Sequence, residues 1–389
     1  MKSVYMDYAA TTPTDPDVVK AMLPYFSERY GNPSSLHAFG QSAKHAVEES
    51  REAVAALIGA KAEEVVFTSG GTESNNFALK GTAWAMKSRG NHIITSAIEH
   101  HAVSEPLAFL EKEGFRITRI PVDPLGMVDP ADVEAAITDE TILISVMHGN
   151  NEIGTIQPIS AIGNMARERN IPFHSDAVQT VGHLPIRVDN LHVDLLSASG
   201  HKFYGPKGVG FLYIRKGTRI QPFLHGGEQE RGRRASTLNV PAIVGMGKAA
   251  ALAGERMPED ETRIGALRDR MIAAILEKVD NSRLNGHPSL RLANNVNISF
   301  EFVEGESLLL NLDMVGVACS TGSACASTTV EPSHVLSAIG LSHALAHGSL
   351  RFTLGRHTTP ADVDYVLDIL PSIVNKLRAV SPAYRKHHE

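Results

Sequence analysis

The stretch Ser197–Gly210, SASGHKFYGPKGVG, places one lysine, Lys202, on a turn of small residues between two strand-like apolar segments, Val193–Leu196 and Val209–Ile214. A lysine changes its pKa readily when it is partly removed from water, which suits it to Schiff-base chemistry. An ordinary loop lysine at the end of a strand is the alternative, and this stretch alone favours it. A phosphate-binding G-x-x-x-x-G-K-[ST] loop is excluded, because Pro206 stands where that motif requires lysine.

The composition is that of a soluble globular protein. The chain has 389 residues, of which 43% are hydrophobic and 21% charged, and its formal net charge is −6. This length favours a large domain with a smaller one, and the negative charge argues against nucleic acid or an anionic membrane as a partner. We find no run of about 18 apolar residues that could span a bilayer and no signal-peptide core. Two cysteines, Cys319 and Cys325, fit a reducing compartment, so we expect a cytoplasmic protein.

Strand-like and helical segments alternate along the chain. The strand candidates are apolar runs, which indicates strands that are buried on both faces. Strands are expected at 64–68, 92–96, 116–122, 141–147, 172–176, 193–197 and 209–214, and helices at 41–58, 73–88, 102–113, 131–137, 160–169 and 240–279. This order predicts an α/β fold with a mainly parallel sheet and a site at the strand ends. We expect an N-terminal arm over 1–15, a large domain over 16–262 and a small α+β domain over 263–389.

The turn Ser69–Thr72 lies between a predicted strand and a predicted helix. Its small residues leave backbone N–H groups free to face a phosphate, and Thr72 adds a hydroxyl donor. Glycine-rich turns are also common between strands and helices that bind nothing.

Asp176 and Gln179 stand at the end of another predicted strand. Such a carboxylate often caps the helix that follows. Alternatively, an ionised Asp176 pairs with a protonated pyridine nitrogen, so that the ring acts as an electron sink, and Gln179 donates to the phenolic oxygen of the ring.

Two histidine pairs invite a metal hypothesis. No cysteine or carboxylate cluster joins His100 and His101 at ligand spacing, which argues against a metal there. One of these rings could stack on a planar cofactor and share in proton transfer, or both could be ordinary strand-end residues. His343 and His347 lack the glutamate of an HExxH motif, so we interpret them as non-ligands.

The segment 318–327, ACSTGSACAS, consists mostly of small and polar residues. Cys325 near its end could be an exposed, reactive thiolate or a structural residue. Cys319 follows an apolar run and is expected to be buried and inert. Arg351, on a predicted strand, could bind a substrate carboxylate through two hydrogen bonds or form a structural ion pair.

A set of motifs occurs in a fixed order over nearly the whole chain. They are DYAATTP, YGNPSSLHAFG, GGTESNN, IEHHAV, HGNNEIGTIQPI, HSDAVQ, SASGHKFYGPKGVG, RASTLN, STGSACAS and SLRFTLGRHTT. Together they resemble the NifS/IscS-type cysteine desulfurases of the class-V aminotransferase family. The resemblance implies the pyridoxal-phosphate fold type I, with a mainly parallel seven-stranded sheet in the large domain. It further implies a homodimer that converts L-cysteine to L-alanine and passes the sulfur, as a persulfide, to an iron–sulfur scaffold protein. A selenocysteine lyase or another class-V aminotransferase is the alternative.

The resemblance also assigns roles to single residues. Lys202 would hold the cofactor covalently, Cys325 would accept the sulfur and His100 would stack on the ring, while Asp176 would pair with the pyridinium and Gln179 with the phenolic oxygen. The remaining cofactor and substrate contacts would come from Gly71, Thr72, Ser199 and His201 at the phosphate, Thr237 at the partner subunit's phosphate, and Asn151 and Arg351 at the substrate carboxylate. Asn151 would also face the cofactor. No resident metal is implied, although Cys325 could contribute to a transient iron–sulfur cluster.

The departures from the family pattern remove no reacting group. Thr321 replaces a common serine, Ala326 a common threonine, and Gly149 and Gly200 replace bulkier residues. The SxGSAC form resembles the long-loop subgroup, whose persulfide is handed to a scaffold protein.

Overall fold

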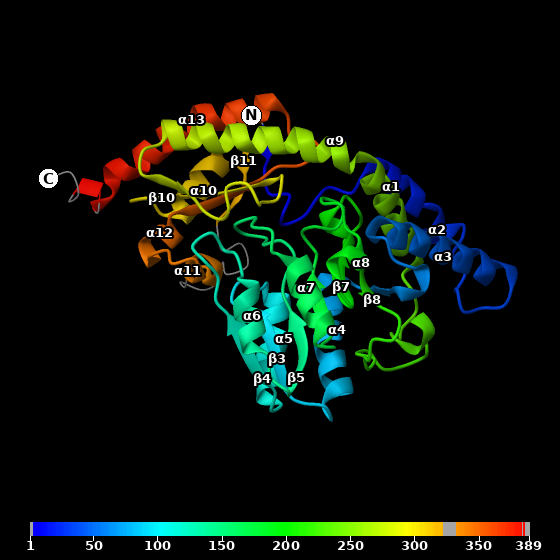
Figure 1. The fold of residues 1–389 in the computed structure, drawn as a ribbon. Helices are drawn as coiled ribbons and strands as arrows, with labels where there is room; N and C mark the ends of the chain where they lie inside the picture. Colours follow the sequence, from blue (N-terminus) through cyan, green and yellow to red (C-terminus); the bar gives the residue numbers. More distant parts are fainter. Residues whose placement is uncertain (1–2, 322–331, 383, 386–389) are drawn as a thin grey trace.

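A seven-stranded sheet forms the centre of the computed structural model, which describes residues 3–321, 332–382 and 384–385 (Figure 1). Its strands lie in the order β2-β8-β7-β6-β5-β3-β4. They are β2 (Val65–Thr68), β3 (His92–Ser96), β4 (Arg116–Ile120), β5 (Thr141–Ser145), β6 (Phe173–Asp176), β7 (Leu195–Ser199) and β8 (Gly210–Ile214). Only β8 runs antiparallel to its neighbours β2 and β7; the other pairs are parallel. The predicted α/β class and mainly parallel seven-stranded sheet are confirmed.

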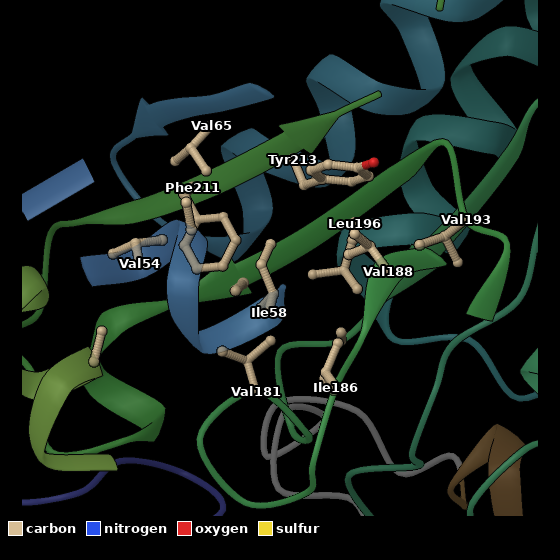
Figure 2. Packing of buried hydrophobic residues seen from close by; sticks show 14 of the residues in the cluster. Val54, Ile58, Val65, Val181, Ile186, Val188, Val193, Leu196, Phe211 and Tyr213 are labelled. Atoms are coloured by element: carbon tan, nitrogen blue, oxygen red, sulfur yellow. The ribbon is translucent and has the colours of Figure 1, made fainter. Parts of the chain in front are cut away.

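Helices cover both faces of this sheet, because successive side chains of a strand point to opposite faces. Val65 and Phe67 of β2 belong to the core on one face, with α3, α7 and α9 (Val240–Lys278). Val66 belongs to the core on the other face, with α4 and α5. In Figure 2, Val54 and Ile58 of α3 lie against Phe211 of β8. The helices of this part are α3 (Ala38–Ile58), α4 (Gly71–Met86), α5 (His101–Lys112), α6 (Pro130–Ala136), α7 (Ile159–Glu168) and α8 (Val188–Leu191), with 3-10 turns at Ala62–Glu64, Gly200–Lys202 and Glu230–Gly232.

Several predicted boundaries were wrong by one to three residues; α4, for example, is Gly71–Met86 rather than 73–88, β4 ends at Ile120 rather than 122, and β5 ends at Ser145 rather than 147. Two of the differences have clear local reasons. Helix α3 begins three residues before the predicted 41, because the His37 ring accepts the Gly40 N–H at 3.3 Å and caps an earlier first turn. Strand β7 begins at Leu195 rather than 193, because the Asp194 side chain turns to accept the Phe173 N–H at 3.0 Å.

The C-terminal part has its own small sheet and core. Its antiparallel sheet has the order β12-β13-β10-β9, and its core is separate from those of the large sheet. The elements are β9 (Ser282–Leu284), β10 (Asn295–Phe300), α10 (Gly305–Met314), β11 (Val317–Ala318), β12 (Ser320–Thr321), α11 (His334–Ala338), α12 (His343–His347), β13 (Ser349–Thr353) and α13 (Pro360–Val380).

Helix α9 (Val240–Lys278) joins the two parts without a break. Its side chains up to Ala253 belong to a core of the large sheet, and those from Ile264 onward belong to the C-terminal core. Figure 1 shows α9 running along the top of the molecule, beside α13 over its C-terminal half. The predicted domain limit between 262 and 263 therefore lies inside a helix, and the domain limits stay a prediction.

The N-terminal segment crosses from one part to the other. Strand β1 (Val4–Tyr5) pairs with β11, and Asp7 bridges to Thr353 of β13. The chain then passes the large sheet to reach α1 (Pro16–Met22) and α2 (Pro24–Ser27). In the part of the chain that the structure describes, no helix has the length and apolar character to cross a membrane.

Candidate active site

A cavity of about 250 Å³ lies at the carboxyl ends of the parallel strands, where ligands of open α/β sheets bind. It brings together residues from α4, α5, the ends of β6 and β7, and β13. The predicted site residues that line it are Gly71, Thr72, His100, Asn151, Asp176, Gln179, Ser199, His201, Lys202 and Arg351. Residues as far apart as 71 and 351 in sequence are therefore neighbours in space.

The start of α4 forms one end of the cavity. The first backbone N–H groups of a helix have no helical carbonyl to bind and carry the positive end of the dipole. Glycine is needed at position 71, because a Cβ there would lie 2.7 Å from Cγ2 of Val178. The hydroxyls of Thr72 and Ser199 lie in the same lining. The His201 ring contacts the Thr11 hydroxyl at 3.1 Å, and burial lowers its pKa to about 4, so the ring is neutral.

Asp176 is held from two sides and is only 5% exposed. One carboxylate oxygen accepts the Val178 N–H at 2.9 Å. The residues after Asp176 form turns, so the prediction that it caps a following helix was wrong. The other accepts the side-chain amide of Asn75 at 2.7 Å. Asp176 therefore both caps the turn that follows it and lines the cavity.

Sequence reasoning missed Asn75, although it belongs to the quoted GGTESNN motif. It lines the cavity and is fully buried. The spacing from Thr72 could have found it, since residues three apart lie on the same face of a helix. Helix α4 thus presents both Thr72 and the amide that orients Asp176.

His100 caps the first turn of α5. Its Nδ1 accepts the Ala102 N–H at 3.0 Å. Burial, the largest cause, lowers the pKa of His100, and the positive charge of Lys202 acts in the same direction, against Asp176.

Lys202 lies at the end of the 3-10 turn after β7 and reaches the N-terminal segment. Its Nζ donates to the carbonyl oxygens of Ala9 at 2.5 Å and Ala10 at 2.9 Å. The amide of Gln179 donates to the same Ala9 oxygen at 3.1 Å. The sequence prediction did not include Ala9 and Ala10, because their contribution is backbone only.

Arg351 of β13 is 2% exposed and joins three parts of the chain. One guanidinium nitrogen pairs with Asp7 at 2.9 Å, and the other donates to the carbonyl oxygen of Asn151 at 2.9 Å. Arg351 therefore forms a structural ion pair and also lines the cavity, and its binding of a substrate carboxylate stays a prediction.

Thr237 stands apart from this cavity. It is exposed and lines a separate hollow of about 220 Å³ together with Ser69 and Arg234. Cys325 lies outside the described residues.

Cys319 is buried, as expected, and burial raises the pKa of its thiol. His343 and His347 contact each other at 3.2 Å between their Nε2 atoms. Within the described residues, no three histidine, cysteine or carboxylate side chains gather in a way that could hold a metal ion.

Two buried carboxyl groups near the cavity were not predicted. They are Glu99 and Glu152. Burial is the largest cause in both, and it raises the pKa of Glu99 to about 8 and that of Glu152 to about 7. The Ser333 hydroxyl donates to Glu152 at 2.5 Å. Their burial is a property of the tertiary structure, and nothing in their local sequence distinguishes them from surface acids.

A family model described as aminotransferase class-V matches residues 4–366. The chain is 58% identical to cysteine desulfurase IscS of Dictyoglomus turgidum, over 98% of this chain and 97% of that protein. It is 57% identical to cysteine desulfurase IscS of Methanosarcina thermophila, over 100% of this chain and 96% of that protein. The chain belongs to the NifS/IscS-type cysteine desulfurases of the class-V aminotransferase family.

Solved structures of the family agree with this assignment. A NifS-like protein that is 38% identical superposes with a TM-score of 0.91, over 96% of this chain and 100% of that one. A structure described as SspA in complex with cysteine is 39% identical, with a TM-score of 0.81, over 92% of this chain and 100% of that one. The class-V family depends in general on pyridoxal phosphate.

Proposed function

We propose that this desulfurase uses pyridoxal phosphate to convert L-cysteine to L-alanine and takes up the sulfur as a persulfide on Cys325. The observation that carries the proposal is the convergence of Lys202, Asp176 and His100 on one cavity. The names of the relatives, and the cysteine in the SspA structure, support the substrate.

The donors and charges around the cavity fit the proposed cofactor. The α4 terminus with Gly71 and Thr72, together with Ser199 and His201, supplies N–H and hydroxyl groups for a phosphate. Asp176 would hold the protonated pyridine nitrogen, Gln179 would reach the phenolic oxygen, and Lys202 would hold the cofactor covalently. Bound pyridoxal phosphate supplies an electron sink for the Cα–H bond of the substrate.

Residues of the chain would bind the substrate, move its Cα proton and accept its sulfur. Asn151 and Arg351 would bind the substrate carboxylate, and the Lys202 amine would accept the Cα proton. Cys325 would receive the sulfur, so that its S–S bond forms as the Cβ–S bond of cysteine breaks. The reaction balances without an added oxidant, because L-cysteine and the Cys325 thiol become L-alanine and a Cys325 persulfide.

We propose a homodimer as the working form. Apolar side chains crowd the surface around α1, α2 and the start of α3, where Leu23 is 59% and Phe26 63% exposed. Burial of such side chains against a second copy is favourable. Thr237, outside its own cavity, would then contact the partner subunit's phosphate.

The persulfide would pass to an iron–sulfur scaffold protein in the cytoplasm, and Cys325 could hold a transient cluster during the transfer. A selenocysteine lyase or another class-V aminotransferase remains the alternative. Product analysis separates them, because a transaminase needs a keto-acid acceptor whereas a desulfurase releases alanine and leaves a persulfide.

The decisive experiment compares Cys325→Ser with Cys319→Ala in protein loaded with pyridoxal phosphate. Both variants should keep the visible absorption of the loaded cofactor. We expect Cys325→Ser to lose persulfide formation and alanine release from L-cysteine by about 10² or more, since it removes the nucleophile. Cys319→Ala removes a buried thiol and should keep both. Full sulfur transfer by Cys325→Ser would refute the role of Cys325.

A further inference from the structure

The turn Ser69–Thr72 borders two different hollows of the molecule. Gly71 and Thr72 line the cavity of the candidate active site, whereas Ser69 lines the separate hollow that contains Thr237. In the proposed homodimer, the cavity would hold the phosphate of the subunit's own cofactor, and Thr237 would contact the phosphate bound in the partner subunit. A single turn of the chain therefore lies beside both of the proposed phosphate contacts.

Glu73, in the first turn of α4, connects this turn to the segment that leads to Thr237. Its Oε2 accepts the backbone N–H of Ser69 at 2.7 Å. Arg234 donates to the same carboxylate twice, from Nε to Oε1 at 2.8 Å and from Nη2 to Oε2 at 3.1 Å. Paired hydrogen bonds of this kind fix the orientation of both groups. The turn is thus tied to Arg234, which lies three residues before Thr237.

The ion pair of Glu73 and Arg234 is largely shielded from water. Its side chains are 10% and 15% exposed, whereas those of the surface pair Glu111 and Arg119 are 39% and 41% exposed. Burial acts to raise the pKa of Glu73, but the hydrogen bonds from Arg234 and Ser69 lower it overall, so the carboxylate is ionised. Removal of one partner from a buried pair leaves the other charge uncompensated, which costs far more than the loss of a surface pair.

A second buried ion pair fixes the start of the segment that leads to Thr237. Glu230 accepts two hydrogen bonds from the guanidinium of Arg51 on α3, at 2.7 and 2.8 Å, and one from the N–H of Phe67 on β2 at 2.8 Å. The segment is therefore held against α3 and β2 through Glu230 and against α4 through Arg234. Its end at Thr237 follows the position of both anchors.

Given the proposed function and its homodimer, we infer that Glu73 and Arg234 are positioning residues that link the two cofactor sites. Through Ser69, Glu73 sets the turn that faces the phosphate of its own subunit. Through Arg234, it sets Thr237, which faces the phosphate of the partner subunit. Loss of the pair therefore weakens cofactor binding in both sites, including a site whose own subunit is unchanged.

The test uses hybrid dimers, isolated by two affinity tags, in which only one site can hold the cofactor covalently. One subunit carries Lys202→Ala and the other is wild type. The visible absorption of covalently bound cofactor then reports the wild-type site alone, and titration with pyridoxal phosphate gives its dissociation constant. Adding Glu73→Gln to the Lys202→Ala subunit leaves every residue of the wild-type subunit unchanged, so it acts on that site only through Thr237 of the variant subunit.

We expect Glu73→Gln to raise this dissociation constant about tenfold, as for the loss of a hydrogen bond to a charged group. Arg234→Lys, which keeps the charge but cannot form the paired hydrogen bonds, should have the same effect. Thr237→Ala in the same subunit should also raise the constant, and its combination with Glu73→Gln should add little, because both act on one contact. Glu111→Gln is the matched control and should leave the constant unchanged.

An unchanged dissociation constant with both Glu73→Gln and Arg234→Lys overturns the inference, whether or not Thr237→Ala raises it. The midpoint of urea unfolding is measured for each variant, because a merely structural pair would lower this midpoint and leave the wild-type site unaffected. A wild-type chain that binds no pyridoxal phosphate covalently, or that stays a monomer, would instead contradict the proposed function.

Discussion

At the scale of single residues, Glu99 differs most from what its local sequence indicates. It precedes His100 directly and is 2% exposed. One carboxyl oxygen accepts from the Ser96 hydroxyl at 2.6 Å and from the Met147 N–H at 2.9 Å. The other has no hydrogen-bond partner among the described residues. Burial, helped by the charge of Asp176, raises the pKa of Glu99 to about 8, so it is a neutral acid at pH 7.

This raised pKa predicts how stability changes with pH. The unfolded carboxyl ionises near 4.5 and the folded one near 8, so the folded state holds the extra proton between these values. The contribution of Glu99 to the free energy of unfolding is fully present below pH 4.5 and is lost as the pH rises through about 8. We expect Glu99→Gln to stabilise the protein at pH 8 relative to pH 5, as measured by the midpoint of urea unfolding at both values.

The control for this prediction is Glu111→Gln. Arg119, through a hydrogen bond, lowers the pKa of Glu111, so its carboxyl is ionised throughout this pH range. Its replacement should shift both midpoints equally. A Glu99→Gln variant with the pH dependence of the wild type would contradict the assignment of a neutral Glu99.

At the scale of elements, the contact between α3 and α9 depends on small residues. The 3.6-residue period of both helices is visible in the sequence, but their crossing point is not. At Gly247 of α9, a Cβ would lie 2.6 Å from the Cα of Ser50 on α3. At Gly254, one pair of turns farther along, the nearest atom is Cδ1 of Leu57 at 3.9 Å. The close approach of α3 therefore requires glycine at position 247, whereas nothing nearby requires it at position 254.

These distances predict opposite effects of the same substitution. Gly247→Ala should force the helices apart and lower the free energy of unfolding by about 1–3 kcal/mol. Gly254→Ala fits without a clash and should raise it by about 0.5–1 kcal/mol, since alanine favours the helix. Urea unfolding of both variants, followed by the fluorescence of Trp84, measures the difference. Equal midpoints would mean that α3 and α9 do not approach closely at Gly247.

At the scale of the whole molecule, Arg351 connects the three parts that build the cavity. It extends from the small sheet to Asp7 of the N-terminal segment and to the Asn151 carbonyl of the large part. The same N-terminal segment supplies the carbonyls that hold Lys202. Helix α9 carries the side chains of two cores and so ties the small sheet to the large one.

Arg351→Lys tests whether this connection also binds substrate. Lysine keeps the charge but cannot form the paired hydrogen bonds of a guanidinium. We expect the KM for L-cysteine to rise about 10- to 100-fold, as for the loss of a charged hydrogen bond, with a smaller change in kcat. Steady-state kinetics check this, with the exposed Arg119→Lys as a control that should change neither value. An unchanged KM would leave Arg351 a structural ion pair only.

The sequence by itself determined the order of the elements and the buried parallel strands, and it singled out Lys202, Asp176 and His100 as candidates. These features depend on periodicity and on motifs that lie within a few neighbouring residues. The family resemblance added Asn151 and Thr237, and it gave Cys325, which lies outside the described residues, the role of sulfur acceptor. Local patterns were sufficient to predict the helices and strands, because the conformation of each depends on residues that are close together in the sequence.

Only the tertiary structure decided which atoms meet. The Asn75 amide reaches Asp176, the Ala9 and Ala10 carbonyls reach Lys202, and Thr237 lies apart from the cavity of its own chain. The neutral state of Glu99 likewise follows from burial beneath distant segments. Contacts of this kind join residues that are about a hundred or more positions apart, and they form only when the strands are ordered in the sheet. No local sequence pattern indicates the order of the strands in the sheet.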